Sequence, residues 1–170
     1  IESIDHDADG KGTCDRCVGQ GRRSIRGRHV QECMRMISTV AEGHRFDAGE
    51  LVAFCDALYR AHGMRDDIAA SSARILVEAD LLGHSTHGMA LLAGYLGALD
   101  QKTLRAAGDP VIEHQRTVTQ TWDGQRLSGL WLTERAINTA TDLAKAHGSG
   151  TIVVKHSHHI ACLAAYLEAP

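Results

Sequence analysis

The sequence predicts an α/β fold in which an N-terminal helical part precedes a unit of strands and helices. Apolar residues recur with a helical period from residue 47 to residue 99, which is typical of amphipathic helices. A β-branched, alternating stretch follows at residues 117–122, and a second helical pattern at residues 132–147 leads into an apolar stretch at residues 151–154. Helices first, and then alternating strands and helices, indicate this fold class.

The chain divides into three regions. Residues 1–43 are rich in Gly, Arg and Asp and carry no persistent period, so we expect an irregular extension that is disordered or not native to the fold. Residues 44–109 form the expected helical region. Residues 110–170 are the expected start of an incomplete α/β domain, because strand, helix, strand and a short helix make a sheet that needs further strands.

Two short motifs in residues 1–43 resemble metal sites but are incomplete. Asp5-His6-Asp7-Ala8-Asp9-Gly10 matches the first half of a calcium loop, whereas its twelfth position holds Arg16 in place of the bidentate Glu. Cys14 and Cys17 form a single C-x-x-C pair, and zinc needs two further ligands. We therefore expect exposed loop cysteines and no metal site.

Two helices open the helical region. The first covers residues 47–63, with Asp47 and Glu50 in a capping-box arrangement and Gly63 as the left-handed stop. The second covers residues 67–82 and ends at Gly83. Residues at helical spacing are expected to face the core: Leu51, Phe54, Cys55 and Leu58 in the first helix, and Ile68, Ser72, Ile75, Leu76 and Ala79 in the second.

A third helix is expected to begin at Ser85 or Thr86 and to continue through Leu91, Leu92, Tyr95, Leu96 and Leu99. This placement puts His84 at the joint between two helices and His87 in the first turn of the later one. Beyond it, residues 117–122 are the first expected strand, and Asp123-Gly124 is a strong turn signal.

The end of the chain continues the alternation. A fourth helix is expected at residues 132–147, stopped by Gly148, and a buried strand at residues 151–154. Residues 155–159 then form a loop, and residues 161–168 a final helix. The fourth helix is expected to turn these residues inward: Ala136, Ile137, Ala140, Leu143 and Ala144.

The overall composition limits the function classes. A formal net charge of −3 gives no bulk attraction to nucleic acid or anionic lipid. No apolar run approaches the roughly 18 residues that span a bilayer, and the N-terminal residues lack the pattern of a signal peptide. We therefore expect a cytoplasmic protein without nucleic-acid or membrane partners, with its 5 cysteines as reduced thiols.

Two histidine-centred motifs carry the candidate chemistry: Leu82-Gly83-His84-Ser85-Thr86-His87-Gly88 and Ser157-His158-His159-Ile160-Ala161-Cys162-Leu163. Histidine gives or takes a proton near neutral pH because its unperturbed pKa is about 6.5. One hypothesis is that His87 donates a proton to a ketone oxygen as hydride arrives, with Thr86 or Ser85 fixing the ring. The alternatives are a metal at His84 and His87, which needs a third ligand, and ordinary residues at a helix edge.

A dinucleotide fingerprint does not support the hydride-transfer hypothesis. Gly19-Gln20-Gly21 lies in the irregular region, and Gly148-Ser149-Gly150 follows a helix rather than a strand. Residue chemistry alone therefore leaves these alternatives open.

The run from Glu78 to Gly88 resembles the signature A-D-x-x-G-H-x-[ST]-H-G of the type-2 malate/L-lactate dehydrogenase family. The likeness continues through Asp123-Gly124 and Ala146-His147-Gly148 to the second motif, which is similar to S-N-H-F-G, and covers residues 45–170. It implies an NAD(P)-dependent oxidoreductase whose cofactor domain is a non-Rossmann, mixed-sheet fold. The family includes ureidoglycolate, sulfolactate and piperideine-2-carboxylate oxidoreductases.

The resemblance also implies roles for individual residues. His87 matches the proton donor, Thr86 the hydroxyl residue that supports it, and His159 the histidine at the cofactor and substrate site. The cofactor, NAD or NADP, is then expected along the backbone that follows, at Ile160, Ala161, Cys162 and Leu163. The implied substrate is a small 2-oxo or 2-hydroxy carboxylate, or a cyclic imine analogue.

The chain departs from the family pattern at several positions. Many members have an arginine for the substrate carboxylate three or four residues after the active histidine, where this chain has Ala90 and Leu91. His158, Ile160 and Ala161 replace Asn, Phe and Gly of the second motif. Family members are longer, so we expect an N-terminal fragment of a protein that forms homodimers when complete.

Two other functions remain as alternatives to the enzyme. A catalytically inactive fragment would serve as a helical interaction module and would not bind nicotinamide cofactor. A small metal-binding protein would use the Asp-rich and C-x-x-C segment of residues 5–17.

Overall fold

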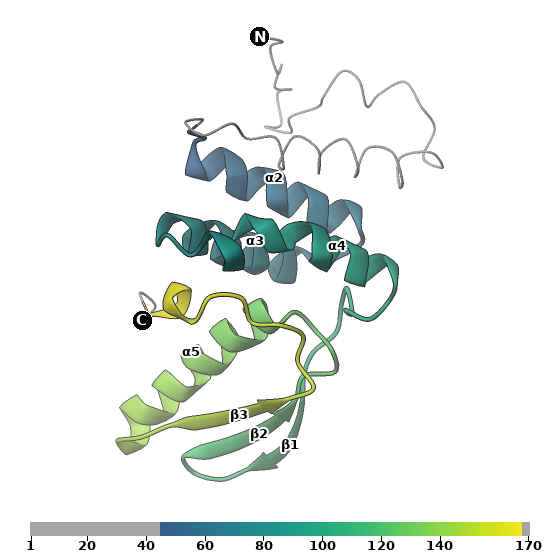
Figure 1. Ribbon diagram of the computed structural model, residues 1–170. Coiled ribbons are helices and arrows are strands. Elements are labelled where there is room, and N and C mark those ends of the chain that lie inside the picture. Colours follow the sequence, from purple (N-terminus) through teal and green to yellow (C-terminus); the bar gives the residue numbers. More distant parts are fainter. Residues whose placement is uncertain (1–44, 168–170) are drawn as a thin grey trace, which may run out of the picture. The chain divides into compact units, whose positions relative to one another are not determined.

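The fold is given by a computed structural model that describes residues 45–167. The expectations for residues 1–43, including the calcium-like loop and the C-x-x-C pair, lie outside the described residues. Within them the fold is mixed α/β, as the sequence predicts: helices α2, α3 and α4 come first, followed by a three-stranded sheet and helix α5 (Figure 1).

Helices α2 (Ala48–Ala61) and α3 (Asp66–Leu81) form close to where the sequence predicts them and pack against each other. The Asp47 side chain accepts a hydrogen bond from the Glu50 main-chain N–H at 3.0 Å, which caps α2. The predicted inner stripe of α3 is confirmed, since all five of its residues are fully buried. On α2, Cys55 is buried, whereas Leu51, Phe54 and Leu58 are half-buried.

The prediction of one continuous third helix is wrong. Two short 3₁₀ turns, η1 (Ser85–His87) and η2 (Met89–Leu91), precede α4 (Leu92–Asp100). They are separated by Gly88, whose backbone is neither helical nor extended, with φ −99° and ψ −136°. Asp80 accepts a hydrogen bond from the Met89 N–H at 2.8 Å and so draws this segment back onto α3. His87 therefore lies in a 3₁₀ turn and not in the first turn of an α-helix.

The sheet has the order β1-β2-β3 and is mixed. Strand β1 (Val111–Gln115) runs antiparallel to β2 (Thr119–Asp123), and β2 runs parallel to β3 (Thr151–Lys155). Helix α5 (Gly129–His147) makes the crossover between the two parallel strands and contacts β3. The predicted strands are present as β2 and β3, but the prediction that residues 151–154 are buried is wrong, since β3 alternates between exposed and half-buried residues and has a neighbouring strand on one side only. Strand β1 carries no alternating apolar pattern and was missed.

Both ends of α5 follow from local chemistry. The predicted stop is confirmed, because Gly148 adopts a left-handed φ of 86° directly after His147. The helix begins three residues earlier than predicted, after the turn in which the Leu127 N–H bonds the Gly124 carbonyl at 2.8 Å. Of the predicted inward residues Ala136 is buried, while Ile137, Ala140, Leu143 and Ala144 are half-buried.

The predicted final helix at residues 161–168 is replaced by a short 3₁₀ turn, η3 (Leu163–Tyr166). The cause lies in the preceding residues, because Ala161 has a positive φ of 54° and Cys162 is extended, so an α-helix cannot begin there. The Tyr166 hydroxyl donates to the Ile160 carbonyl at 2.7 Å and fastens the turn onto the loop before it.

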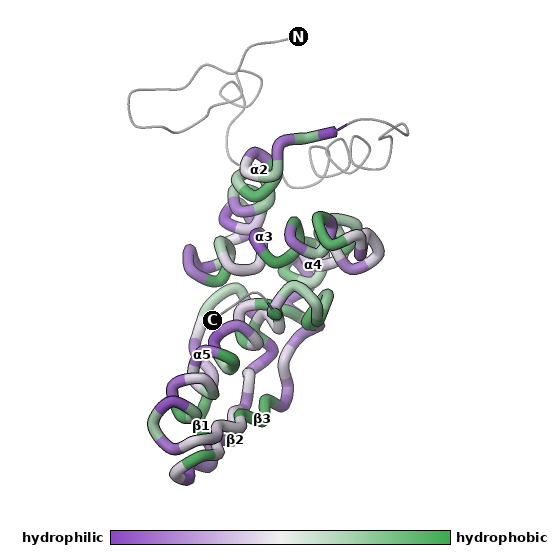
Figure 2. The backbone as a smooth tube through the Cα atoms, turned by 90° about the vertical axis from the view of Figure 1, so that its left-hand side faces the viewer, coloured by the Kyte–Doolittle hydropathy of each residue, from purple (hydrophilic) through white to green (hydrophobic). Residues whose placement is uncertain are grey.

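The helical part and the α/β part are joined by a polar contact between α3 and α5. The Ser72 and Ser128 hydroxyls share a buried hydrogen bond of 2.7 Å, and Ser71 and Arg74 both contact the Glu134 carboxylate. Polar and apolar residues alternate along the helices (Figure 2). Among the described residues, a helix with the length and hydropathy needed to cross a membrane is not found.

Candidate active site

The fold brings together the two histidines that lie in separate sequence motifs. His87 comes from η1, and His159 from the loop that follows β3. Their rings are close to parallel, with an interplanar angle of 28° and 6.0 Å between the ring centroids. Both residues are exposed, so one small molecule can contact both rings.

His87 has the hydroxyl neighbour that the sequence predicts. The Thr86 Oγ1 lies 3.0 Å from the His87 Nδ1, within hydrogen-bond range. This contact restrains the ring of His87 and leaves its Nε2 edge to solvent or ligand. The pair is thus suited to a proton transfer that needs one fixed ring orientation.

The segment that carries His87 is fixed by Asp80. A Cβ added at Gly88 would fall onto the Asp80 carboxylate, so only glycine permits this close approach. Burial raises the pKa of Asp80, while the hydrogen bond from the Met89 N–H lowers it. The A-D and H-G positions of the first motif therefore meet in space and set the path of the chain past His87.

His159 is held through one ring nitrogen by two partners. The Tyr95 hydroxyl lies 2.8 Å from the His159 Nδ1, and the main-chain N–H of Ala161 donates to the same atom at 3.2 Å. Burial raises the pKa of the Tyr95 hydroxyl, which keeps it protonated. The helical pattern placed Tyr95 only within the expected third helix and gave it no role. The available signal was a phenol among apolar residues, whose hydroxyl usually needs a partner when it is buried.

The loop that carries His159 packs tightly against the start of α5. The Arg126 N–H donates to the His156 carbonyl at 2.7 Å, and the His158 N–H donates to the Leu127 carbonyl at 3.0 Å. A Cβ at Gly129 would collide with the main-chain carbonyls of His158 and His159. His159 therefore extends from a loop that is fixed along most of its backbone.

The predicted cofactor segment offers two kinds of surface. The side chains of Ala161 and Cys162 are buried, so they can present only backbone atoms, and Ile160 is half-buried. Leu163 is 67% exposed, an apolar side chain left in solvent four residues after His159. Leu163 is thus an exposed aliphatic side chain on the same segment as His159.

The other candidate groups have structural explanations. The His84 N–H donates to the Ala79 carbonyl, and its own carbonyl accepts from the His87 N–H, both at 2.8 Å. Gly148 is the left-handed end of α5, and Gly150 lies against the Ala140 carbonyl. Within residues 45–167, three or more His, Cys, Asp or Glu side chains do not gather as they would around a metal ion.

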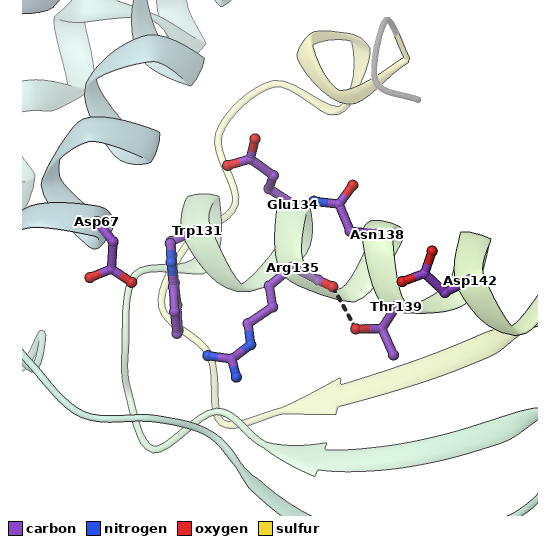
Figure 3. A pocket seen from close by; sticks show the side chains of 7 residues that line it. All are labelled: Asp67, Trp131, Glu134, Arg135, Asn138, Thr139 and Asp142. Atoms are coloured by element: carbon purple, nitrogen blue, oxygen red, sulfur yellow. Dashed lines mark hydrogen bonds between the residues drawn. The ribbon is translucent and has the colours of Figure 1, made fainter.

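A hollow of about 360 Å³ lies beside α5 and is lined by no residue of either histidine motif (Figure 3). Three of its four charged side chains are paired within the protein: Arg135 with Asp109 at 2.9 Å, Asp67 with Arg65 at 2.6 Å, and Glu134 with Arg74. It is lined by Asp67, Trp131, Glu134, Arg135, Asn138, Thr139 and Asp142. These internal ion pairs favour a structural surface over a second reaction site.

The fold and the histidine pair define an α/β protein with a site suited to acid–base chemistry. A family model for malate/L-lactate dehydrogenase matches residues 46–169. Hydroxycarboxylate dehydrogenase B of Escherichia coli O157:H7 is 30% identical over 126 residues, which cover 74% of this chain and 35% of that protein. L-sulfolactate dehydrogenase of Methanothermobacter thermautotrophicus is 31% identical over 96 residues, which cover 56% and 28%.

Solved structures agree with these matches. The structure of a putative malate/lactate dehydrogenase from E. coli superposes with a TM-score of 0.70 at 29% identity, covering 74% of this chain and 35% of that one. The chain belongs to the malate/L-lactate dehydrogenase family. It spans about a third of the length of the curated relatives it matches.

Proposed function

We propose that the protein is an NAD(P)-dependent oxidoreductase that interconverts a small 2-oxo carboxylate and its 2-hydroxy acid, with a cyclic imine analogue as the related substrate class. The observation that carries this proposal is the contact of the His87 and His159 rings at 6.0 Å in a chain of the malate/L-lactate dehydrogenase family. Two relatives of this chain are named hydroxycarboxylate and L-sulfolactate dehydrogenases, and both names denote oxidation of a hydroxy acid.

His87 is the proposed proton donor. The bound nicotinamide supplies or takes the hydride. Negative charge then develops on the substrate oxygen, and a histidine within hydrogen-bond reach neutralises it by giving up a proton. Thr86, 3.0 Å from the His87 Nδ1, keeps the ring directed at one position. In the reverse direction the neutral His87 accepts the proton of the hydroxyl group.

His159 and the residues after it are the proposed binding surface. The exposed ring of His159 contacts substrate or cofactor, and Leu163 offers an apolar surface to the nicotinamide ring. Ile160, Ala161 and Cys162 would line the cofactor mostly through backbone atoms, because two of these side chains are buried. NAD and NADP both fit this proposal.

The substrate carboxylate needs a positive partner or several donors, and Ala90 and Leu91 supply neither. Among the described residues, Arg74 and Arg135 are paired with Glu134 and Asp109. The exposed rings of His87 and His159 can donate hydrogen bonds to a carboxylate oxygen in place of the arginine. This arrangement favours a small substrate whose carboxylate reaches the histidine pair itself.

The proposal is tested by NAD(P)H oxidation with the full-length gene product against a panel of 2-oxo acids and one cyclic imino acid. His87→Ala should lower kcat/KM by about 100-fold or more, the range of general-acid catalysis. His114→Ala, which removes an exposed histidine on β1, should leave it unchanged. Cofactor binding without turnover on any substrate would refute the substrate class, and no cofactor binding would refute the oxidoreductase and favour the interaction module.

A homodimer in the cytoplasm is the proposed state of the complete protein. It rests on the family resemblance, since shared sites across a dimer interface are typical there. Sedimentation equilibrium of the full-length gene product should give twice the mass of the chain. A monomer that turns over substrate at the same rate would refute this part.

A further inference from the structure

His159 receives hydrogen bonds from two sides on the same ring atom. The Tyr95 hydroxyl lies 2.8 Å from the Nδ1, and the Ala161 N–H donates to it at 3.2 Å. Both partners are well placed, because Tyr95 is a buried residue of α4 and Ala161 is buried in the loop after β3. The His159 ring is therefore oriented by groups that cannot move away easily.

The Ala161 N–H decides which ring nitrogen of His159 carries the proton. A main-chain N–H can only donate, so the atom that accepts from it must hold a free lone pair. The Nδ1 of the neutral ring is therefore unprotonated, and the hydrogen is on the Nε2. The Tyr95 hydroxyl, which burial keeps protonated by raising its pKa, then acts as the second donor to the Nδ1.

We propose that Tyr95 is a positioning residue that, together with the Ala161 N–H, holds neutral His159 in the Nε2–H tautomer, so that His159 donates a hydrogen bond to an oxygen of the carboxylate substrate. This inference rests on the proposed function for the identity of the ligand. It goes beyond that function by giving the two histidines different roles: His159 donates a hydrogen bond to the substrate, and His87 transfers the proton.

The Nε2–H of His159 has no protein acceptor within residues 45–167, and the ring is exposed. A donor free of protein partners, beside a second histidine at 6.0 Å, suits a carboxylate or keto oxygen, which accepts hydrogen bonds. A pair of rings this close can hold one oxygen-rich group of a small acid without a guanidinium. This accounts for a carboxylate site in which Ala90 and Leu91 replace the arginine.

Tyr95 is itself held in place by its ring. The Tyr95 and His158 rings meet edge to face with 5.4 Å between their centroids, a favourable aromatic geometry. Replacing Tyr95 by Phe keeps this packing and removes only the hydroxyl. The variant thus separates the hydrogen bond to His159 from the packing of α4.

The tautomer is read directly from the ¹⁵N and ¹H resonances of ring-labelled histidine in the full-length gene product, at a pH where the ring is neutral. Wild-type His159 should show an unprotonated Nδ1 and a protonated Nε2. In Tyr95→Phe the Nδ1 resonance should move towards that of a nitrogen without a hydrogen bond, and the other tautomer should become detectable. Tyr59→Phe is the control, because its buried hydroxyl has no partner among the described residues, and it should leave His159 unchanged.

Ligand titrations complete the test. Oxamate, an unreactive analogue of a 2-oxo acid, should shift the His159 Nε2–H resonance, and NADH alone should shift it less. Tyr95→Phe should raise KM for the 2-oxo acid about tenfold, with a smaller effect on kcat. An Nδ1–H tautomer in the wild type, identical spectra in Tyr95→Phe, or a shift with NADH that is equal to or larger than the shift with oxamate would overturn the proposal. Wild-type protein with the expected tautomer but without any turnover would instead refute the proposed function and leave the tautomer assignment standing.

Discussion

Gly88 is the residue on which the position of His87 depends most directly. It follows His87 in the chain and lies against the Asp80 carboxylate, where a Cβ would collide with that group. Gly88 is visible in the sequence as part of a motif. The sequence does not show that the Asp80 carboxylate occupies the space that a side chain at residue 88 would need. The contact crosses from α3 to the 3₁₀ turns and exists only in the folded chain.

Gly88→Ala should therefore destabilise the protein by about 1–3 kcal/mol, the usual cost of overpacking, and should reduce activity by displacing His87. Thermal and urea unfolding of the two proteins measure the change. Gly97→Ala is the matched control, since a Cβ there meets no atom within 4 Å on helix α4. Helix propensity predicts a gain of roughly 0.5–1 kcal/mol for it, and equal losses in both variants would contradict this role of Gly88.

Ala161 occupies a backbone conformation that suits glycine. Its φ of 54° is left-handed, and it stands where the family motif has Gly. The strain of roughly 1–2 kcal/mol for an L-residue there exceeds the added chain entropy of an unfolded Gly, about 0.4–1 kcal/mol. Ala161→Gly should raise the free energy of unfolding by about 0.5 kcal/mol.

Chemical denaturation measures this change in stability. Ala164→Gly, in the 3₁₀ turn η3 at ordinary backbone angles, provides the comparison and should lower stability. If Ala161→Gly destabilised the protein as much as Ala164→Gly does, the left-handed backbone at residue 161 would be refuted.

Asp80 makes the stability of the folded protein depend on pH, with a contribution that decreases as the pH rises. Burial raises the pKa of this carboxyl in the folded state above its ordinary value of about 4. The folded state therefore binds the proton more tightly than the unfolded state, and the contribution of Asp80 to stability falls as the pH rises from about 4 through the folded pKa. The hydrogen bond from the Met89 N–H offsets part of this rise in the pKa, because it stabilises the charged carboxylate.

Asp80→Asn keeps an acceptor oxygen for Met89 and removes the buried charge. The Tm of Asp80→Asn should increase relative to the Tm of the wild type as the pH rises from 4. The difference between the two Tm values should become constant near neutral pH. Scanning calorimetry across pH 4–8 measures both curves. A difference that shrinks with rising pH would show that the folded pKa of Asp80 is lowered rather than raised.

At the scale of elements, the buried Ser72–Ser128 hydrogen bond joins α3 to the start of α5. Ser128 stands at the N-cap of α5 but makes no capping bond there, because its hydroxyl is 2.7 Å from that of Ser72. Both residues are at most 2% exposed. Loss of one hydroxyl leaves the other buried without this partner.

Ser72→Ala and Ser128→Ala should each cost about 1–3 kcal/mol in the free energy of unfolding. The double variant should cost less than the sum of the two, because it leaves no orphaned hydroxyl. A double-mutant cycle by urea denaturation gives the coupling energy. Strict additivity would mean that the hydrogen bond does not join the two helices.

The elements that the sequence predicts well are those whose signals are local. Capping at Asp47, the stripe of α3 and the glycine stop of α5 all depend on neighbours within a few residues. The third helix was mispredicted because Asp80, from another element, breaks it at Gly88. Strand β1 was missed because its residues are exposed, so the alternation that marks a half-buried strand is absent.

The candidate site likewise has features that are visible in the sequence and features that only the fold creates. The two histidine motifs are visible in the sequence, and Thr86 beside His87 follows from adjacency. Their meeting at 6.0 Å depends on the crossover through α5, which residue spacing does not encode. Tyr95 was expected only as a residue of the third helix, since a helical period shows where a helix runs and not which hydroxyl contacts a histidine.

For the whole molecule, family membership explains why these elements are assembled in this order. The matched segment contains the mixed sheet, the helical part before it and the two histidine motifs, and it covers 35% of the first relative, which is therefore about three times as long. The described residues supply both histidines of the proposed site. We therefore propose that hydride transfer takes place at this histidine pair.

Label transfer by the full-length gene product would test hydride transfer at this pair. NAD(P)H deuterated at both C4 positions is supplied with the 2-oxo acid that gives turnover, and the product is analysed by NMR. We expect a 2-hydroxy acid with deuterium at carbon 2, formed about 100-fold or more slowly by His87→Ala. Cofactor oxidation without deuterium at carbon 2, or equal transfer by His87→Ala, would contradict it.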